Sequence, residues 1–256
     1  MNSPVLSRKS HKWLTLVIGV QALLWMLSGA YMVTIDLDFI HGDPLVRNMV
    51  ENLEANFDEL YPIDDILARH DGAESVDLVS RLGEPYYVVS ANSGSLLLDA
   101  RSGVQQSPLP ESRIVDLAEH FYAGSGTVNA VRLLTVDDPK PTEIQTRPLP
   151  LWQVSFDDRI RTTFYLSPST GELITRRHTF WRGFDFLWML HIMDYENRSD
   201  VNNNLLRVAS AVGLLTALSG VWLLIFSLRR HRPAIDHMPG GPPPHGSFDD
   251  SAAKAT

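Results

Sequence analysis

The 256-residue chain contains no cysteine. That absence excludes disulfide bonds, thiolate metal sites and catalysis by a thiol nucleophile. A metal bound by this chain would therefore be held by histidine, methionine, tyrosine or carboxylate side chains. The formal net charge of -8 argues against nucleic acid as a partner, because binding to a phosphate backbone depends on an excess of lysine and arginine.

The sequence also lacks the short motifs of common hydrolases and nucleotide-binding proteins. It has no G-x-S-x-G, no H-E-x-x-H and no glycine-rich phosphate loop. Acidic pairs such as Asp64–Asp65 and Asp157–Asp158 are present, but neighbours in sequence point apart on a helix or a strand. We interpret these pairs as solvated surface charge rather than as catalytic dyads.

What the chain does have is two long apolar runs. WLTLVIGVQALLWMLSGAYMV covers residues 13–33, and VASAVGLLTALSGVWLLIFSL covers residues 208–228. Each has the length at which a helix crosses a lipid bilayer. We predict transmembrane helices at 13–33 and 205–228. The first run has an alternative as a cleaved signal peptide, since basic residues precede it and LSGA ends in small residues, but its length favours an uncleaved anchor.

Each apolar run has basic residues next to the end that is nearer to a chain terminus. They precede the first run within residues 1–12 and follow the second run within residues 229–256. Short flanks rich in lysine and arginine stay in the cytoplasm, so both termini are predicted to be cytoplasmic and the region between the runs to lie outside. The tail at 229–256, rich in proline and glycine near its end, is predicted to be disordered.

The region between the runs is predicted to be α+β. After a connector at 34–60, residues 61–180 carry two similar units, each a helix followed by three strands. The runs YYVVSANSGSLLLDARSG and LWQVSFDDRIRTTFYLSPSTG share one plan, with an aromatic-led strand, a polar turn, a second strand and a turn ending in glycine. In the second unit, alternation places Trp152, Val154 and Phe156 on one buried face of a sheet.

Together these features resemble a known family. The units ending in LLLDARSG and FYLSPSTGEL are similar to PepSY domains, HKW leads into a span ending in LSGAYM, and WMLH precedes a span containing LSGVWLL. The chain thus resembles the PepSY-associated transmembrane helix family over about residues 8–230. The resemblance implies a bacterial inner-membrane protein with a periplasmic domain of two PepSY-like repeats. Larger, four-span members are linked to ferric-siderophore reduction with membrane haem held by histidines, whereas other PepSY proteins are non-enzymatic.

The histidines near the spans are the candidate haem ligands that the resemblance implies. His11 and His191 match the family's positions, and a low-spin haem b needs two axial ligands. About 30 Å of hydrocarbon separates the two faces of the membrane, so one haem cannot bridge this pair. His11 would pair with His231 on the cytoplasmic side. His191 would pair with His178, with a second His191 in a homodimer, or with a ligand from a larger membrane complex.

The segment 181–204 sets the surroundings of His191. On a helix, Trp181, Phe184, Trp188 and His191 share one face. Asp194 is three residues further and is predicted to orient the second ring nitrogen of His191, as carboxylates do for metal-bound histidine. The alternative is an interfacial aromatic helix without haem, because tryptophan, phenylalanine and histidine rings collect at membrane surfaces.

Two functions from different classes follow. The first is a haem-associated component of iron uptake or ferric-chelate reduction, which requires bound haem and sensitivity to replacement of His191 or His11. The second is a non-enzymatic, membrane-anchored binding or regulatory module whose outer domain contacts a protein partner. The sequence feature that discriminates between these two functions is the number of histidines at membrane depth.

Overall fold

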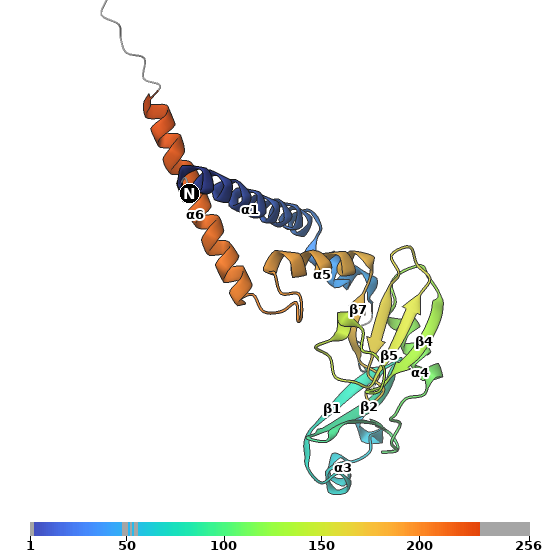
Figure 1. The fold of residues 1–256 in the computed structure, drawn as a ribbon. Coiled ribbons are helices and arrows are strands. Elements are labelled where there is room, and N and C mark those ends of the chain that lie inside the picture. Colours follow the sequence, from blue (N-terminus) through green and yellow to red (C-terminus); the bar gives the residue numbers. More distant parts are fainter. Residues whose placement is uncertain (1–2, 48–50, 52, 54–55, 231–256) are drawn as a thin grey trace, which may run out of the picture. The chain divides into compact units, whose positions relative to one another are not determined.

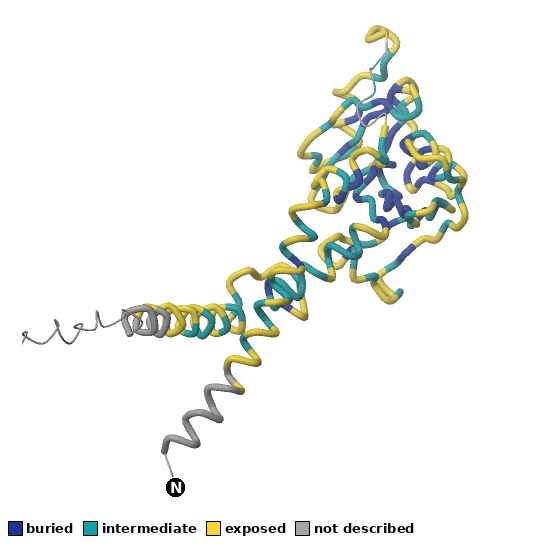
Figure 2. Tube along the Cα trace, turned by 90° about the horizontal axis from the view of Figure 1, so that it is seen from above, coloured by how far each residue is buried: buried dark blue, intermediate teal, exposed yellow. Residues whose placement is uncertain are grey.

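The computed structural model describes residues 3–47, 51, 53 and 56–230 (Figure 1). The chain divides into two units, residues 1–209 and 210–256. It is a mixed α+β protein with two long apolar helices and two small antiparallel sheets, which confirms the α+β part of the predicted fold class. Figure 2 shows that the buried residues concentrate in the part of the first unit that carries the sheets.

The two long helices contain the two apolar runs. Helix α1 spans Ser3–Thr34 and helix α6 spans Asn204–Arg230. Within them, Thr15–Thr34 and Asn204–Val221 are long and apolar enough to cross a membrane. Only 6% of the stretch in α1 is buried, so α1 does not serve as a core helix for the sheets.

The first sheet is a three-stranded meander that follows a short helix. Its elements are α3 (Ile63–Arg69), β1 (Ala73–Arg81), β2 (Glu84–Ala91) and β3 (Gly94–Asp99), with strand order β1-β2-β3. Leu82 and Gly83 both have positive φ, as a two-residue hairpin between right-twisted strands requires. Helix α3 covers one face of the sheet because Ile66 is buried against Tyr87 and Leu98.

The second sheet also follows a helix, but it has four strands rather than the predicted three. Its elements are α4 (Glu111–Phe121), β4 (Val128–Leu134), β5 (Leu151–Phe156), β6 (Thr163–Leu166) and β7 (Leu173–Arg177). The order is β4-β5-β6-β7. After the PSTG turn, with Gly171 at φ 68°, the chain returns along β6 and pairs Leu173 with Leu166. The prediction ended the strands of the second unit at the PSTG turn and therefore did not include β7.

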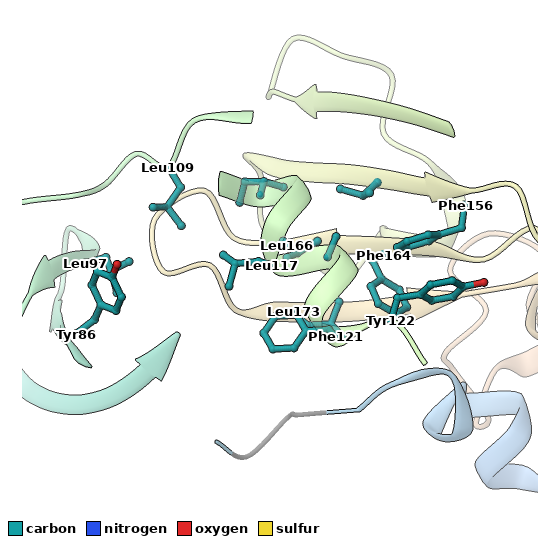
Figure 3. Packing of buried hydrophobic residues seen from close by; sticks show 13 residues of the cluster. Tyr86, Leu97, Leu109, Leu117, Phe121, Tyr122, Phe156, Phe164, Leu166 and Leu173 are labelled. Carbon is teal, nitrogen blue, oxygen red and sulfur yellow. The ribbon is translucent and has the colours of Figure 1, made fainter. Parts of the chain in front are cut away.

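Helix α4 supplies the main core. Its buried face consists of Ile114, Leu117, Ala118 and Phe121. This face packs with residues of both sheets, from Tyr86 and Leu97 in the first to Phe156, Phe164 and Leu166 in the second (Figure 3). The predicted buried face of β5 is confirmed, because Val154 and Phe156 belong to this core and Trp152 packs against it.

The connector predicted at 34–60 contains short helices and contacts α4, the helix that precedes the second sheet. It holds α2 (Leu37–His41), η1 (Asp43–Leu45) and η2 (Phe57–Glu59). Arg47 N–H donates to the carbonyl of Phe121 at 2.8 Å, and Ala123 N–H donates to that of Leu45 at 2.9 Å. These bonds attach the connector to the end of α4.

Candidate functional site

The candidate site lies where helix α5 (Thr179–Ile192) packs along α1. Tyr31 Oη donates to the carbonyl of Phe180 at 3.0 Å, near the start of α5. Trp25 Nε1 donates to the carbonyl of His191 at 2.9 Å, near its end. The order of these contacts makes the two helices antiparallel. Gly183 permits the close approach, since a Cβ there would lie 3.2 Å from Tyr31 Oη.

The imidazole of His191 is held by a serine of α1. Its Nδ1 lies 2.8 Å from Ser28 Oγ, and Ser28 Oγ donates to the carbonyl of Leu24 at 2.7 Å. A hydroxyl has one proton, so with that proton on the Leu24 carbonyl, Nδ1–H of His191 donates to Ser28. Nε2 then carries the lone pair, and no described residue hydrogen-bonds to it. This is the tautomer in which an imidazole binds a metal through Nε2.

His191 lies beside the apolar stretch of α1 rather than beyond its end. Its contact residue Ser28 precedes Thr34, the last residue of that stretch, by six residues, or about 9 Å along a helix. The prediction that His191 lies at the outer face rested on its position along the chain, and it remains a prediction. Helix α5 folds back along α1, and this return determines where the imidazole lies.

The face of α1 toward α5 carries polar groups within an apolar run. Gln21, Trp25 and Ser28 recur at spacings of four and three, so they share one face. Ser28 is 1% exposed, and Nε2 of Gln21 is buried with no hydrogen-bond partner among the described residues. His191 of α5 contacts two of the three members of this polar strip, Trp25 and Ser28.

Asp194 does not orient His191, contrary to the prediction. Its carboxylate accepts hydrogen bonds from four backbone N–H groups in the loop that follows α5, with N–O distances of 3.3, 3.1, 3.0 and 2.9 Å. The donors are Glu196, Asn197, Ser199 and Asp200. The hydrogen bond from Asp200 N–H contributes most to lowering the pKa of Asp194 to about 2. Asp194 therefore organises the loop between α5 and α6. Ser28, not Asp194, holds the second ring nitrogen of His191.

His178 is a structural residue at the junction of β7 and α5. It is fully buried, and its Nε2 lies 2.9 Å and 3.1 Å from the carbonyls of Phe39 and Ile40, so Nε2 carries the proton. Burial lowers the pKa of His178. It precedes His191 by 13 residues along α5, or about 20 Å. The predicted pairing of His178 with His191 on one iron is therefore wrong for a single chain.

The predicted pair on the other side of the membrane falls outside what the structure describes. His11 belongs to α1, but its side chain is not among those described, and His231 lies outside the described residues. Among the described residues, no group of three or more histidines and carboxylates could hold a metal ion. Of the two predicted ligands whose side chains are described, His191 leaves Nε2 without a hydrogen-bond partner in the described part of the chain, whereas His178 does not.

A charged network connects the second sheet to α5. Glu143, in the short helix η3 (Thr142–Ile144), accepts from Arg182 Nε at 2.6 Å and Nη2 at 3.0 Å. Tyr165 Oη donates to the same carboxylate at 2.6 Å. The guanidinium of Arg177 lies 3.9 Å from the centre of the Trp181 ring. No sequence pattern pointed to Glu143, whereas Ser28 was visible as a polar residue in the LSGA end of the first run.

A separate cavity of about 450 Å³ lies between the first sheet and the β6–β7 turn. Its walls combine charged residues of both signs, Asp77, Arg81 and Glu172, with the apolar side chains of Phe121 and Leu173. Such a mixed surface suits a ligand or peptide with both polar and apolar groups.

No family model, no curated protein and no solved structure matches this chain.

Proposed function

We propose that this protein is a bacterial inner-membrane protein that binds haem b through His191, as a component of iron uptake or ferric-chelate reduction. The observation that supports this proposal is the pairing of Nδ1 of His191 with Ser28, which leaves Nε2 without a partner among the described residues. Haem would supply one-electron chemistry when bound. Ser28 would fix the ring and keep Nε2 deprotonated.

The proposal requires a second axial ligand from outside the single chain. His178 is about 20 Å from His191 along α5 and already donates to two backbone carbonyls. We therefore assign the second ligand to His191 of a second copy, so that a homodimer binds one haem. Both termini are placed in the cytoplasm and the α+β domain in the periplasm, with two PepSY-like repeats, in keeping with the basic flanks of the spans.

The first test is the visible spectrum of the full chain purified in mild detergent, oxidised and then dithionite-reduced. A Soret band and a reduced α-band that vanish in His191→Ala, but persist in the exposed-histidine control His41→Ala, support the proposal. One haem per two chains, from haem quantification and the mass of the detergent-solubilised complex, supports the homodimer. A featureless spectrum after growth with added haem contradicts the proposal.

A second candidate function is a non-enzymatic, membrane-anchored module that binds a partner in the 450 Å³ cavity. The mixed charges and apolar walls of that cavity favour it. This function predicts that no cofactor is bound and that His191→Ala leaves binding of the partner in the cell unchanged. It also predicts that Asp77→Asn together with Glu172→Gln abolishes this binding. The spectrum and these variants separate the two functions.

A further inference from the structure

A second, smaller cavity lies where the first sheet meets the start of α4. Its volume is about 210 Å³, and its apolar wall consists of Leu97, Leu109 and Leu117. Figure 3 shows these side chains and Tyr86 arriving from β2, β3, the loop before α4 and α4 itself. The walls therefore come from elements that pack in the main core, so the cavity is preformed.

Two guanidinium groups, those of Arg81 and Arg113, line this cavity. Arg81 comes from β1 and Arg113 from α4, and no aspartate or glutamate is among the described lining residues. Within the described part of the chain neither arginine forms an ion pair at 4.0 Å or less; Glu172 and Glu51 attract Arg81 from further away, whereas Arg113 has no such carboxylate. Glu84, the cross-strand neighbour of Arg81, is paired with Arg101 instead.

The hydrogen bonds of these arginines leave donors unused. Arg81 donates from Nε to the carbonyl of Thr170 at 3.2 Å and from Nη1 to that of Ser80 at 2.9 Å. Arg113 Nη2 donates to Tyr86 Oη at 3.0 Å. A guanidinium has five N–H donors, so each group retains free donors. Partly buried cations with spare donors are the usual setting for a bound carboxylate or phosphate.

Tyr86 adds a third donor. It is 9% exposed, and its hydroxyl accepts from Arg113 but has no acceptor for its own proton among the described residues. Buried tyrosine hydroxyls normally have such an acceptor. An oxyanion in the cavity would accept that proton.

We propose that this cavity binds a small ligand with a carboxylate head and an apolar body. The carboxylate accepts hydrogen bonds from Arg81, Arg113 and the Tyr86 hydroxyl. The apolar body packs against Leu97 and Leu117, which favours a carboxylate on a hydrocarbon group over inorganic phosphate. A free organic acid and the C-terminal residue of a peptide share this chemistry. The inference does not depend on haem binding at His191.

The test is calorimetric titration of the full chain in detergent with N-acetyl-leucine. The neutral analogue N-acetyl-leucinamide, which has the same shape, should not bind. Arg113→Gln should weaken binding at least about tenfold, because it removes charge-assisted hydrogen bonds. Arg159→Gln, at an exposed arginine whose side chain forms no hydrogen bond or ion pair in the described structure, is the matched control and should bind like the natural chain.

Further variants keep the test decisive. Arg81→Gln is informative only if its far-ultraviolet circular dichroism and thermal midpoint match those of the natural chain, whereas Arg113→Lys and Tyr86→Phe change donors with little change in volume. Tighter binding of a longer peptide ending in leucine identifies a chain end as the ligand, and equal binding identifies a free acid. Absence of binding at millimolar concentration, equal binding of the amide, or unchanged binding by Arg113→Gln overturns the proposal.

Discussion

The two histidines of α5 differ in what their ring nitrogens contact. His191 directs Nδ1 to a serine hydroxyl and leaves Nε2 without a partner among the described residues. His178 directs Nε2 to two backbone carbonyls and has Nδ1 buried without a partner in the described part of the chain. The first arrangement suits a metal ligand, and the second holds two chain segments together. Substitutions at or beside the two residues should therefore have different consequences.

Ser28→Ala tests whether the serine orients His191. The alanine variant removes the acceptor of Nδ1–H, so the ring can rotate and its Nε2 loses part of its basicity. We expect haem affinity to fall about 10- to 100-fold, the usual effect of losing such a supporting hydrogen bond. Haem titration of the full chain measures this, with Ser93→Ala on the exposed β2–β3 turn as the control. Equal affinities of the two variants would contradict the assigned tautomer.

His178 should make the fold sensitive to mild acid. Burial lowers its pKa in the folded protein below the unfolded value of about 6.5, so the neutral ring is the folded form. This contribution to stability is present above about pH 6.5 and is lost as the pH falls below it, because the unfolded chain then binds more protons. The thermal midpoint should therefore drop between about pH 6.5 and 5.

The control for this acid sensitivity is a pair of substitutions. His178→Gln retains a side-chain donor for the carbonyls of Phe39 and Ile40 but does not titrate, so its midpoint should vary less with pH. His41→Gln changes an exposed ring and should retain the full pH dependence. Identical pH profiles for the two variants would assign the effect to other groups.

At the scale of elements, η3 and the second sheet depend on α5 through Glu143. Replacing it with glutamine removes the negative charge that Arg182 and Tyr165 share, while the size of the side chain is kept. Its side chain is 12% exposed, so we expect a loss of about 2 kcal/mol in the free energy of unfolding. Denaturant unfolding of the full chain in detergent measures the change.

Glu84→Gln is the matched control for that experiment. It also breaks a glutamate–arginine pair, with Arg101, but both side chains are about half exposed, at 51% and 49%. Water and salt screen such pairs, so the unfolding midpoint should barely move. Equal effects of the two glutamine variants would show that Glu143 does not stabilise the junction.

The loop between α5 and α6 should depend on Asp194. Four backbone N–H groups donate to its carboxylate, and Asp194→Ala leaves all of them without that acceptor. We expect faster hydrogen exchange at residues 196–200, measured by mass spectrometry of the corresponding peptide, while exchange in the sheets is unchanged. Glu196→Gln, exposed in the same loop, should leave the exchange rates unaltered.

A feature of the fold or of the candidate site could be predicted from the sequence where neighbouring residues determine it, and not where residues far apart in the chain do. The strands with clear alternation, such as β5, were predicted within about two residues, because alternation follows from the pleat itself. The strand β7 was missed because its five residues follow the PSTG turn, at which the prediction ended the unit. The contact between Trp25 and His191 joins residues 166 positions apart, and nothing in either segment alone specifies it. Asp194 was assigned to the wrong partner for the same reason.

At the scale of the whole molecule, the proposed orientation can be tested directly because the chain has no cysteine. A single introduced cysteine is then the only thiol in the chain, so its labelling reports the accessibility of that position alone. In intact cells with a permeabilised outer membrane, Ser93→Cys should react with a membrane-impermeant maleimide, since the domain is proposed to be periplasmic. Ser251→Cys, in the C-terminal tail, should react only after the inner membrane is broken. The reverse labelling pattern would invert the proposed topology.

The junction between β7 and α5 contains a single residue, His178, between the last residue of the strand and the first of the helix. Rotation at this residue is restrained by the burial of His178, its hydrogen bonds to Phe39 and Ile40, and the ion pair of Arg182 with Glu143, so the sheet and the helix behave as one stiff arm. The 14 residues of α5 span about 21 Å, and a tilt of about 10° at the sheet would carry its far end through about 4 Å. Since His191 sits at that far end, displacement of β7 is mechanically amplified into displacement of its imidazole.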